Sequence, residues 1–313
     1  MAKKYKKALV TGGAGFIGSH IVDALIKKRI RVYVVDDLSS GKKANLNPNA
    51  RFYKMSITSP ALPKLIKRLK PDVIFHYAAQ KDVRKSVADP SFDARVNIMG
   101  SISLIQAAHQ AGTKKIIFAS TGGAMYPDQS RPPWKESLQP APISPYAIAK
   151  RSTELYLEFA RLEYGIGYTA LRMANVYGPR QDAKGEAGVC AIFSETMLRG
   201  GQPKIFGTGK QTRDYVYVGD AVNAAMLAMN RTANGCFNIG TGRQTDLNTL
   251  FKKLRKLTGS DALEKHYPAL PGEVMRSAVN FGLANKKLGW KPKVKLDDGL
   301  KKTVEWFKKS KKL

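Results

Sequence analysis

Short apolar runs alternate with longer amphipathic stretches over the first 180 residues. The apolar runs cover residues 7–11, 31–35, 72–77, 115–119 and 168–172, and the amphipathic stretches cover 19–28, 96–111 and 145–164. A short apolar run is typical of a buried strand, whereas apolar residues that recur every three or four positions indicate a helix. Strands that alternate with helices predict an α/β protein whose doubly wound parallel sheet is covered by helices on both faces.

The pattern changes after residue 179. Residues 181–188 and 200–209 are polar and rich in glycine, and short elements alternate with loops up to a last amphipathic helix at 297–308. We therefore expect residues 1–179 to form the sheet domain and residues 180–313 to form a smaller C-terminal lobe. The lobe is expected to face the sheet edge and to be interleaved with the first domain rather than independent of it.

A glycine-rich turn follows the first predicted strand. Gly13, Gly15 and Gly18 give the spacing G-x-G-x-x-G between a strand and a helix, and the next predicted strand ends in Asp36. In this setting the glycines let the backbone approach a pyrophosphate at the helix N-terminus. Asp36 is expected to accept hydrogen bonds from the adenosine ribose and to repel a 2′-phosphate. The turn thus predicts a Rossmann-like dinucleotide site and favours NAD over NADP.

A tyrosine and a lysine lie one helical turn apart in the predicted helix 145–164. Ser144 suits the N-cap and Pro145 the first turn, so Tyr146 and Lys150 share one face. A phenol ionises near pH ~10, and a neighbouring ammonium favours the phenolate. Tyr146 is therefore a candidate general base. The pair alone is weak evidence in a chain this rich in lysine, and it gains its weight from the dinucleotide turn upstream.

Composition leaves two interpretations of the charge open. Among 313 residues, 53 are Lys or Arg and 24 are Asp or Glu, which gives a net charge of +29. Such a balance is compatible with a nucleic acid or an anionic surface as partner. The lysines are spread along the chain, however, so we favour solvated helix faces and expect no specific nucleic-acid partner.

Other features suggest a cytoplasmic protein without metal. The two cysteines, Cys190 and Cys236, lack metal-ligand spacing and fit a reducing compartment. The basic N-terminus leads into the first strand and is not expected to be a signal peptide. No apolar run approaches the length of a membrane span, so no membrane association is expected.

Nearly end to end, the chain resembles the extended short-chain dehydrogenase/reductases, also called the NAD-dependent epimerase/dehydratase family, and in particular their UDP-glucose 4-epimerase branch. The motifs that carry the resemblance are Thr11–Gly18, Asp36–Gly41, His76–Gln80, Ser120–Gly123, Tyr146-x-x-x-Lys150, Asn175–Pro179, Gln211–Tyr215 and Pro271–Val274. Each motif alone is loose, but the ordered set is typical of enzymes that modify nucleotide sugars.

The resemblance implies an enzyme that holds NAD and epimerises a UDP-hexose at C4 through a transient 4-keto sugar. Tyr146 would take the proton of the 4-hydroxyl, Lys150 would lower the Tyr146 pKa and bind the nicotinamide ribose, and Thr121 would bond O4, with Ser120 as its alternative. UDP-glucose and UDP-galactose are the expected substrates, with N-acetylated hexoses as further candidates. The predicted helices 96–111 and 145–164 resemble the pair through which relatives form homodimers.

The resemblance also assigns binding residues by position. The cofactor-binding set is Gly12, Gly15, Phe16, Ile17, Gly18, Asp36, Asp37, Ser40, Gly41, Ile57, Ala78, Ala79, Gln80, Asn97, Ser120, Tyr146 and Lys150. The substrate-binding set is Thr121, Asn175, Val189, Ile205, Phe206, Arg213 and Arg276. Within it, Asn175 and Arg213 would contact the diphosphate, while Val189, Ile205 and Phe206 would pack on the uracil.

Several positions depart from the family pattern. Leu270 stands where relatives place a second diphosphate-binding arginine, which Arg276 would replace. Ser56 replaces an acidic residue that bonds the adenine. Ser277 falls where relatives set the space at the sugar 2-position, and a small residue there would admit an N-acetyl group.

Two other functions remain as alternatives, whereas a 4,6-dehydratase is disfavoured. A 4,6-dehydratase would need an acid and a base after the threonine, where this chain has Gly122 and Gly123. Another NAD-dependent nucleotide-sugar enzyme, such as a UDP-uronate epimerase, decarboxylase or reductase, is the closer alternative. A basic Rossmann-like protein that binds nucleic acid or another anion is the remote one.

Overall fold

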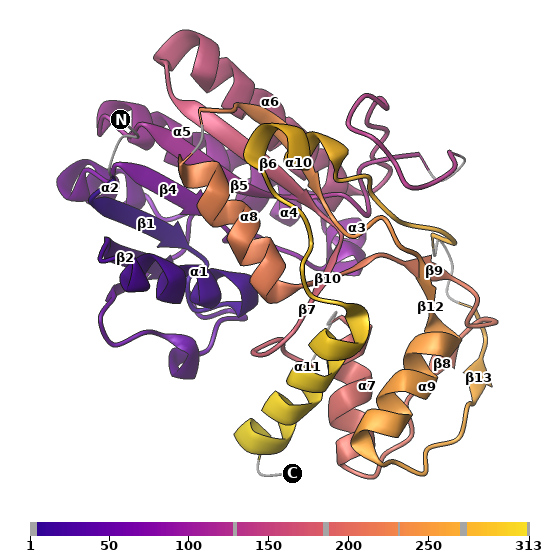
Figure 1. The fold of residues 1–313 in the computed structure, drawn as a ribbon. Coiled ribbons are helices and arrows are strands. Elements are labelled where there is room, and N and C mark those ends of the chain that lie inside the picture. Colours follow the sequence, from indigo (N-terminus) through magenta and orange to yellow (C-terminus); the bar gives the residue numbers. More distant parts are fainter. Residues whose placement is uncertain (1–4, 128–129, 184–187, 231, 270–273, 312–313) are drawn as a thin grey trace.

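Seven parallel strands form one sheet in the order β11–β6–β5–β4–β1–β2–β3 (Figure 1). The computed structural model describes residues 5–127, 130–183, 188–230, 232–269 and 274–311. The strands are β1 (Lys7–Thr11), β2 (Arg31–Asp36), β3 (Arg51–Lys54), β4 (Val73–His76), β5 (Lys115–Thr121), β6 (Gly167–Met173) and β11 (Gly235–Ile239). The strand order reverses between β1 and β4, and ligands bind at such a switch point. The predicted doubly wound sheet is confirmed.

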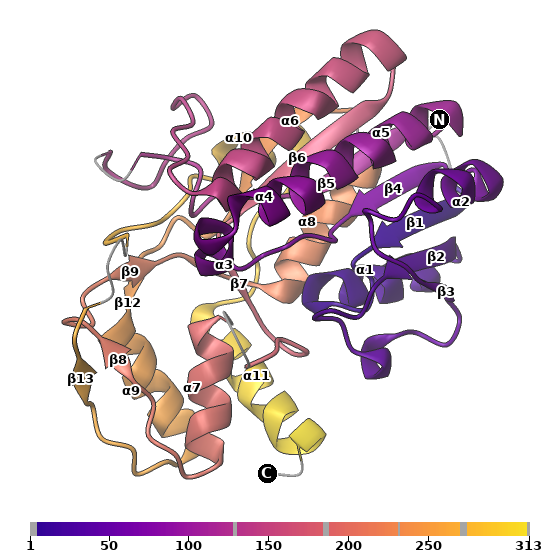
Figure 2. The ribbon, with the colours of Figure 1, turned by 180° about the vertical axis from the view of Figure 1, so that it is seen from behind.

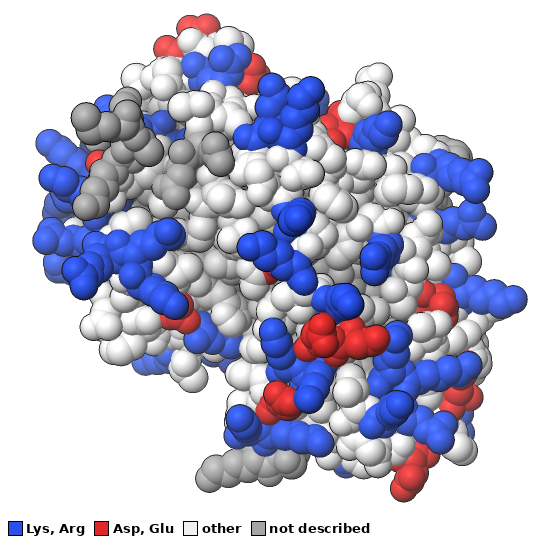
Figure 3. All heavy atoms as spheres, in the orientation of Figure 1, with Lys and Arg blue, Asp and Glu red and all other residues white. Residues whose placement is uncertain are grey.

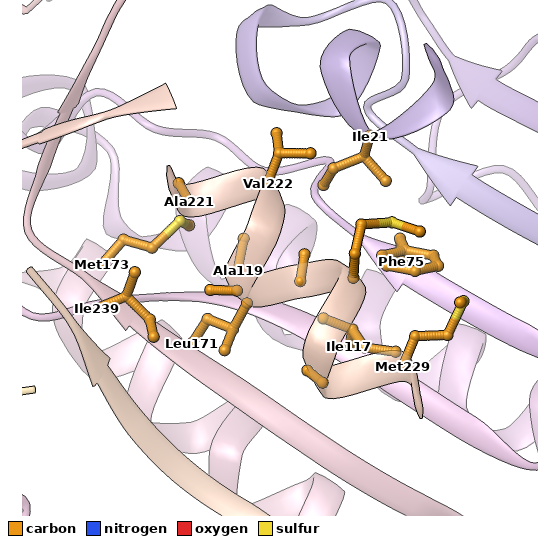
Figure 4. Packing of buried hydrophobic residues seen from close by; sticks show 14 of the residues in the cluster. Ile21, Phe75, Ile117, Ala119, Leu171, Met173, Ala221, Val222, Met229 and Ile239 are labelled. Atoms are coloured by element: carbon orange, nitrogen blue, oxygen red, sulfur yellow. The ribbon is translucent and has the colours of Figure 1, made fainter. Parts of the chain in front are cut away.

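Helices cover both faces of this sheet. Helices α1 (Phe16–Lys27) and α8 (Val218–Asn230) pack on one face, and α2 (Leu62–Leu69), α5 (Gly100–Gln110) and α6 (Pro145–Tyr164) pack on the other. Helices α5 and α6 lie side by side on the outside of the molecule (Figure 2). In the first layer Ile21 of α1 and Val222 of α8 approach Phe75 and Ile117 of the sheet (Figure 4). The apolar runs are therefore buried on both sides, as parallel strands require.

The smaller lobe has its own apolar cluster. Helices α7 (Val189–Leu198), α9 (Leu247–Thr258) and α11 (Leu296–Lys311) enclose Phe193, Phe251, Leu254 and Val304. Short strands pair beside them: β8 (Ile205–Phe206) with β13 (His266–Tyr267), and β9 (Thr212–Arg213) with β12 (Thr245–Asp246). Strands β7 (Asn175–Tyr177) and β10 (Tyr215–Tyr217) pair between the sheet and the lobe.

Two parts of the chain differ from the simplest expectation. Strand β11, helix α8 and helix α10 (Gly282–Leu288) come after residue 180 but pack with the sheet. The single helix expected at 96–111 consists of the π-helix η2 (Arg95–Met99) followed by α5, and two short helices that were not expected, α3 (Val83–Ala88) and α4 (Pro90–Ala94), precede it. A short 3-10 helix, η1 (Lys43–Asn45), follows β2.

The basic side chains are distributed rather than gathered in one block. On the face shown in Figure 3, Lys and Arg side chains are spread over both the sheet body and the smaller lobe. The outer face of α2 illustrates this, since Lys64, Lys67 and Arg68 are exposed while Leu62, Leu65 and Ile66 are buried. Within the described ranges, no helix combines the length and the apolar character that a membrane crossing requires.

Candidate functional site

The glycine turn between β1 and α1 is shaped for close approach. Gly12 has φ +71°, and a Cβ on it would lie 2.6 Å from the backbone nitrogen of Ala78. A Cβ on Gly18 would collide with the carbonyl oxygen of Gly12. Both positions therefore require glycine, because no other residue leaves room for the turn to pack against the end of β4. The backbone at the start of α1 is thereby left open toward the sheet edge, as a pyrophosphate needs.

Asp36 lies at the end of β2, beside this turn. Its carboxylate accepts hydrogen bonds from the backbone N–H of Ala14 (3.0 Å) and of Leu38 (2.8 Å), and the residue is 7% exposed. Burial raises the pKa of Asp36, and the two backbone donors partly oppose that rise. The Asp36 side chain still lines a cavity at the carboxyl ends of the strands, where its oxygens can accept hydrogen bonds from ribose hydroxyls.

A cavity of about 420 Å³ runs along the carboxyl ends of the strands. Most of the predicted cofactor residues line it: Gly12, Gly15, Phe16, Ile17, Gly18, Asp36, Asp37, Ser40, Ile57, Ala78, Ala79, Gln80, Ser120, Tyr146 and Lys150. The other two predicted residues lie just behind its wall. Gly41 packs against the Asp36 carboxylate, and Asn97 is hydrogen-bonded to the backbone of Gln80. Ser56 lines the cavity too, with its hydroxyl 2.9 Å from that of Thr58.

Helix α6 brings the predicted tyrosine and lysine to this cavity. Ser144 caps the helix by accepting a hydrogen bond from the N–H of Ala147 (3.3 Å), and Pro145 occupies the first turn. Lys150 is 3% exposed, and its Nζ donates to the carbonyl oxygen of Ala119 at 2.8 Å. The same Nζ lies 5.7 Å from the ring centroid of Tyr146. The ammonium is thus fixed between strand β5 and the tyrosine.

The surroundings of Lys150 lower its pKa but leave it protonated at neutral pH. Burial lowers the pKa of Lys150 to about 8, while Asp93 and Glu154 oppose the decrease. Behind it, burial first and then the charge of Lys150 lower the pKa of His76 to about 3, so this imidazole is neutral. The His76 ring nitrogens are held by the hydroxyls of Thr11 (2.8 Å) and Ser101 (2.9 Å). Lys150 is therefore the cation beside Tyr146 below about pH 8.

The two hydroxyl residues at the end of β5 point in different directions. Ser120 is 4% exposed and donates to Oε1 of Glu154 on α6 at 2.7 Å. Side chains alternate along a strand, so Thr121 lies on the opposite side, where it is partly exposed. Thr121 is at the expected strand end but is not among the residues that line either cavity.

A buried ion pair lies behind Ser120. Arg172 of β6 donates to both oxygens of Glu154, from Nε at 2.9 Å and from a terminal nitrogen at 2.7 Å. Burial alone would raise the pKa of Glu154, but the hydrogen bonds and charge of Arg172 lower it below its ordinary value. Arg172 also donates to the Tyr126 hydroxyl, which in turn donates to Asn238 of β11. This network ties α6, β5, β6 and β11 together directly behind the site.

A second cavity of about 750 Å³ lies between the sheet edge and the smaller lobe. Four of the predicted substrate residues, Asn175, Val189, Phe206 and Arg213, line it. Gly188 lines both cavities, so the two adjoin. A dinucleotide and a second ligand placed in them would therefore meet near Gly188.

The remaining predicted substrate positions lie outside this lining. Ile205 is fully buried next to Phe206, and Arg276 is exposed beside Thr212, with which it forms an isolated bridge. Ser277 is 2% exposed, and its hydroxyl lies 3.4 Å from the point that a Cβ on Gly123 would occupy. Leu270, the expected departure, lies outside the described residues.

Sequence reasoning missed several cavity residues. Arg84, Lys204 and Gln211 line the second cavity, and Met173, Arg180 and Gln181 line the first. Arg84 follows β4 at the sheet edge, and its position there was a usable signal. Gln211 opens the Gln211–Tyr215 motif, which was a usable signal too. Lys204 comes from the loosely patterned lobe, where nothing in the local sequence distinguishes it from other polar residues.

A dinucleotide cavity at the switch point, with a Tyr–Lys pair on its wall, defines an NAD-binding enzyme of the short-chain dehydrogenase/reductase class. The sequence matches the profile of the NAD dependent epimerase/dehydratase family over residues 8–240. The chain belongs to that family. The predicted family, its enzymatic nature and NAD as its cofactor are thus confirmed.

Individual relatives extend over nearly the whole chain. A UDP-glucose 4-epimerase of Mycolicibacterium smegmatis is 43% identical over 308 residues, covering 96% of this chain and 98% of that protein. The crystal structure of the Thermotoga maritima UDP-glucose 4-epimerase with UDP-glucose is 53% identical with a TM-score of 0.95, covering 97% and 99% of the two chains. The UDP-N-acetylglucosamine 4-epimerase of Methanobrevibacter ruminantium, in complex with UDP-N-acetylmuramic acid, is 39% identical with a TM-score of 0.92, covering 98% and 99%.

Proposed function

We propose that this protein is a 4-epimerase of UDP-hexoses that works through a transient 4-keto sugar. The observation that carries the proposal is that Tyr146 and the buried Lys150 line a cavity suited to NAD, and that this cavity adjoins, at Gly188, a second one lined by Asn175, Phe206 and Arg213. The epimerase names of relatives that match this chain over nearly its full length support it.

The residues divide the chemistry between them. Tyr146 takes the proton of the sugar 4-hydroxyl and later returns it, and Lys150 favours the phenolate by its charge. We assign the bond to O4 to Thr121, because the Ser120 hydroxyl is engaged with Glu154. Since Thr121 lines neither cavity, it would have to turn toward the sugar when substrate binds. NAD held in the first cavity would supply the hydride chemistry at C4, first as acceptor and then as donor to the other face of the sugar. Tyr146 and Lys150 also bind the cofactor, as do the glycine turn and Asp36.

The second cavity suits the nucleotide half of the substrate. The Arg213 guanidinium and the Asn175 amide can bind the diphosphate, since a guanidinium matches phosphate oxygens. Phe206 and Val189 supply an apolar wall for the uracil, with Ile205 packed behind them. Arg276 would reach the diphosphate only if its loop adjusts around the substrate.

The decisive experiment offers three sugars to the purified protein. UDP-glucose should give a mixture with UDP-galactose, and bound nicotinamide should be present in the same sample. UDP-N-acetylglucosamine and UDP-glucuronate, incubated separately, identify the substrate, because relatives are named for both kinds of reaction. Conversion of UDP-glucuronate alone would replace the present proposal by that of a UDP-uronate epimerase or decarboxylase.

Replacing Asp36 by Ala should relax the preference for NAD over NADP, because the carboxylate that repels a 2′-phosphate is lost. The hydrogen bonds from Ala14 and Leu38 are lost as well, so some decrease in stability is expected. Fluorescence titration of the cofactor-free protein with both cofactors measures the ratio. Unchanged strict selectivity for NAD in a folded variant would show that Asp36 does not face the ribose.

Replacing Ser277 by Tyr should depress turnover of N-acetylated UDP-hexoses more than turnover of UDP-glucose. Ser277 is buried beside Gly123, which follows β5, so a large side chain would have to displace its neighbours or extend toward the bound sugar. The kcat/KM values for the two substrates give the measurement. An equal loss on both substrates would mean that Ser277 does not limit the size of the sugar.

The exposed face of α6 predicts a homodimer. Ile148, Leu155, Phe159 and Leu162 recur on one side of this helix and are 47%, 55%, 46% and 63% exposed. A stripe of this kind is typical of an interface. Light scattering at micromolar concentration should report a dimer, and Leu155→Glu should dissociate it. The matched control is Leu263→Glu, which alters a similarly exposed leucine in the smaller lobe and should leave a dimer. A monomeric wild-type protein would refute this assembly.

A further inference from the structure

A buried carboxylate beside the cofactor cavity has no role in the chemistry described so far. Asp93 belongs to the short helix α4 and is 1% exposed. Burying a carboxylate is costly unless hydrogen bonds or an opposite charge compensate for the loss of water. The contacts of Asp93 therefore indicate what the side chain does.

One oxygen of Asp93 connects two predicted cofactor residues. Oδ1 accepts a hydrogen bond from Nε2 of Gln80 (2.9 Å) and another from Nδ2 of Asn97 (2.9 Å). Asn97 in turn bonds both backbone groups of Gln80, accepting from its N–H and donating to its carbonyl oxygen, each at 2.9 Å. Gln80 lines the cavity, so Asp93 fixes a piece of the cavity wall from behind.

The π-helix makes this arrangement possible. Helix η2 inserts a wider turn between α4 and α5, and Asp93 at the end of α4 and Asn97 in η2 are both buried. π-turns of this kind are rare and often occur at functional sites. The carbonyl oxygen of Asn97 also accepts from the hydroxyl of Thr153 on α6 (3.1 Å). Asp93, Asn97 and Gln80 are thus anchored to α6 through Thr153, which lies about one turn after Lys150.

The second oxygen of Asp93 is buried and unpaired. Oδ2 has no hydrogen-bond partner. The side-chain amide of Gln80 donates to the carbonyl oxygen of Asp82 and to Oδ1 of Asp93. The amide of Asn97 donates to the carbonyl oxygen of Gln80 and to the same Oδ1. No cation of the described part of the chain lies within ion-pair distance of Asp93. The carboxylate nevertheless acts on Lys150, since its charge is the largest influence that opposes the decrease in the Lys150 pKa.

The other groups that face Lys150 leave Asp93 as its main counter-charge. Glu154 of α6 is engaged by Arg172 and Arg151, so most of its charge is balanced. His76 of β4 is neutral, and the phenolate of Tyr146 is the charge that Lys150 serves to stabilise. Asp93 of α4 is the remaining carboxylate near the ammonium.

We propose that Asp93 is a positioning residue of the active site, which locks Gln80 and Asn97 together at the cofactor cavity and supplies the negative charge that keeps Lys150 protonated. This inference rests on the proposed function, because it assigns Asp93 an effect on the same Tyr146–Lys150 pair.

Two variants separate the two parts of the proposal. Asp93→Asn keeps the shape and an oxygen for Gln80 and Asn97 but removes the charge. The Lys150 pKa should then fall by about one unit, as expected for the loss of a nearby opposite charge. The alkaline limb of the kcat profile, expected near pH 8 in the wild type, should move to lower pH by that amount. At pH values above this limb, the rate of Asp93→Asn should be about tenfold lower than that of the wild type at the same pH. Asp93→Leu removes the hydrogen bonds too, and should in addition release NAD during purification.

A matched control lies one turn away on the same segment. Asp89 is the exposed N-cap of α4, and its carboxylate accepts from the N–H of Phe92 at 2.9 Å. Asparagine is an equally good N-cap, so Asp89→Asn removes a carboxylate without removing the cap. Its pH profile and NAD content should match those of the wild type.

The outcomes decide between the possibilities. A profile of Asp93→Asn that coincides with that of Asp89→Asn would overturn the electrostatic role, and full retention of NAD by a folded Asp93→Leu would overturn the positioning of Gln80 and Asn97. Wild-type protein that binds NAD but epimerises no UDP-hexose would instead defeat the proposed function. In that case NAD retention by the two Asp93 variants, measured between pH 7 and about pH 9, decides the role of Asp93, because Lys150 also binds the cofactor.

Discussion

Tyr146→Phe is expected to reduce turnover of UDP-glucose by about two to four orders of magnitude, the usual contribution of a general base. The substitution removes the phenolic hydroxyl and keeps the ring, which lies in the first turn of α6 at the wall of the cofactor cavity. Fold and bound NAD should therefore be preserved, as judged by circular dichroism and by nicotinamide released on denaturation. The kcat should carry the loss, because the base acts on the reacting hydroxyl.

Comparison with two other variants isolates the cause. Tyr156→Phe alters a 41% exposed tyrosine on the same helix and should leave the rate unchanged. Lys150→Met removes the cation, so that its residual rate should climb with pH as the phenol ionises without help. It should also weaken the binding of NAD. Near wild-type epimerisation by Tyr146→Phe would require another base, and the mechanism would have to be rebuilt around it.

Arg172→Met is expected to destabilise the fold by about 3–5 kcal/mol, the range for breaking a buried ion pair. Glu154 is fully buried and would keep Ser120 and the partly exposed Arg151 as partners, but would lose its two-point contact with Arg172. The urea midpoint should fall accordingly. Arg172→Met combined with Glu154→Leu should recover much of the loss, because no charge is then left uncompensated. Arg161→Met, which breaks an exposed pair on the same helix, is the control and should barely move the midpoint.

The same pair predicts the direction of acid sensitivity. The pKa of Glu154 is lower in the folded protein than its ordinary value, so folding favours the ionised form. Its stabilising contribution is complete above the unfolded pKa of about 4.3 and is lost as pH falls through the folded value. Wild-type stability should therefore decrease below about pH 4, and the double variant should lose less. An identical acid profile for both proteins would show that the pair does not contribute.

The sheet could be predicted because its signals are local. The glycine turn at Gly12–Gly18, the acid at Asp36 and the Ser144–Pro145 cap depend on steric and hydrogen-bonding rules within a few residues, and the structure contains all three. Helix α9 was also within reach. Asp246 caps it, and Leu247, Leu250, Phe251 and Leu254 follow at helical spacing. The glycine-rich loops on either side of this short helix obscure its pattern.

Other parts depend on contacts between distant segments. Helix α8 is apolar on most sides because it is wedged between α1 and the sheet, so no amphipathic period shows in its alanine-rich sequence. The π-turn η2 and the inward position of Asp93 arise from packing against α6 and the loop after β4. At the site, the Tyr146–Lys150 pair followed from helical spacing. Arg84 and Lys204 come together only through the placement of the smaller lobe.

The late arrival of β11 has a consequence for how this protein is made. Strand β6 pairs with β11 from Thr169 to Met173, yet β11 begins only at Gly235. At about 5–20 residues per second, a ribosome would need roughly 3 to 12 seconds to synthesise the segment between them. During that interval β6 is an open, apolar edge of an otherwise formed sheet, which is the kind of surface that aggregates or recruits chaperones. A fragment that stops at residue 179 would keep that edge permanently, so the nucleotide-binding half should be soluble only when the chain beyond it is present.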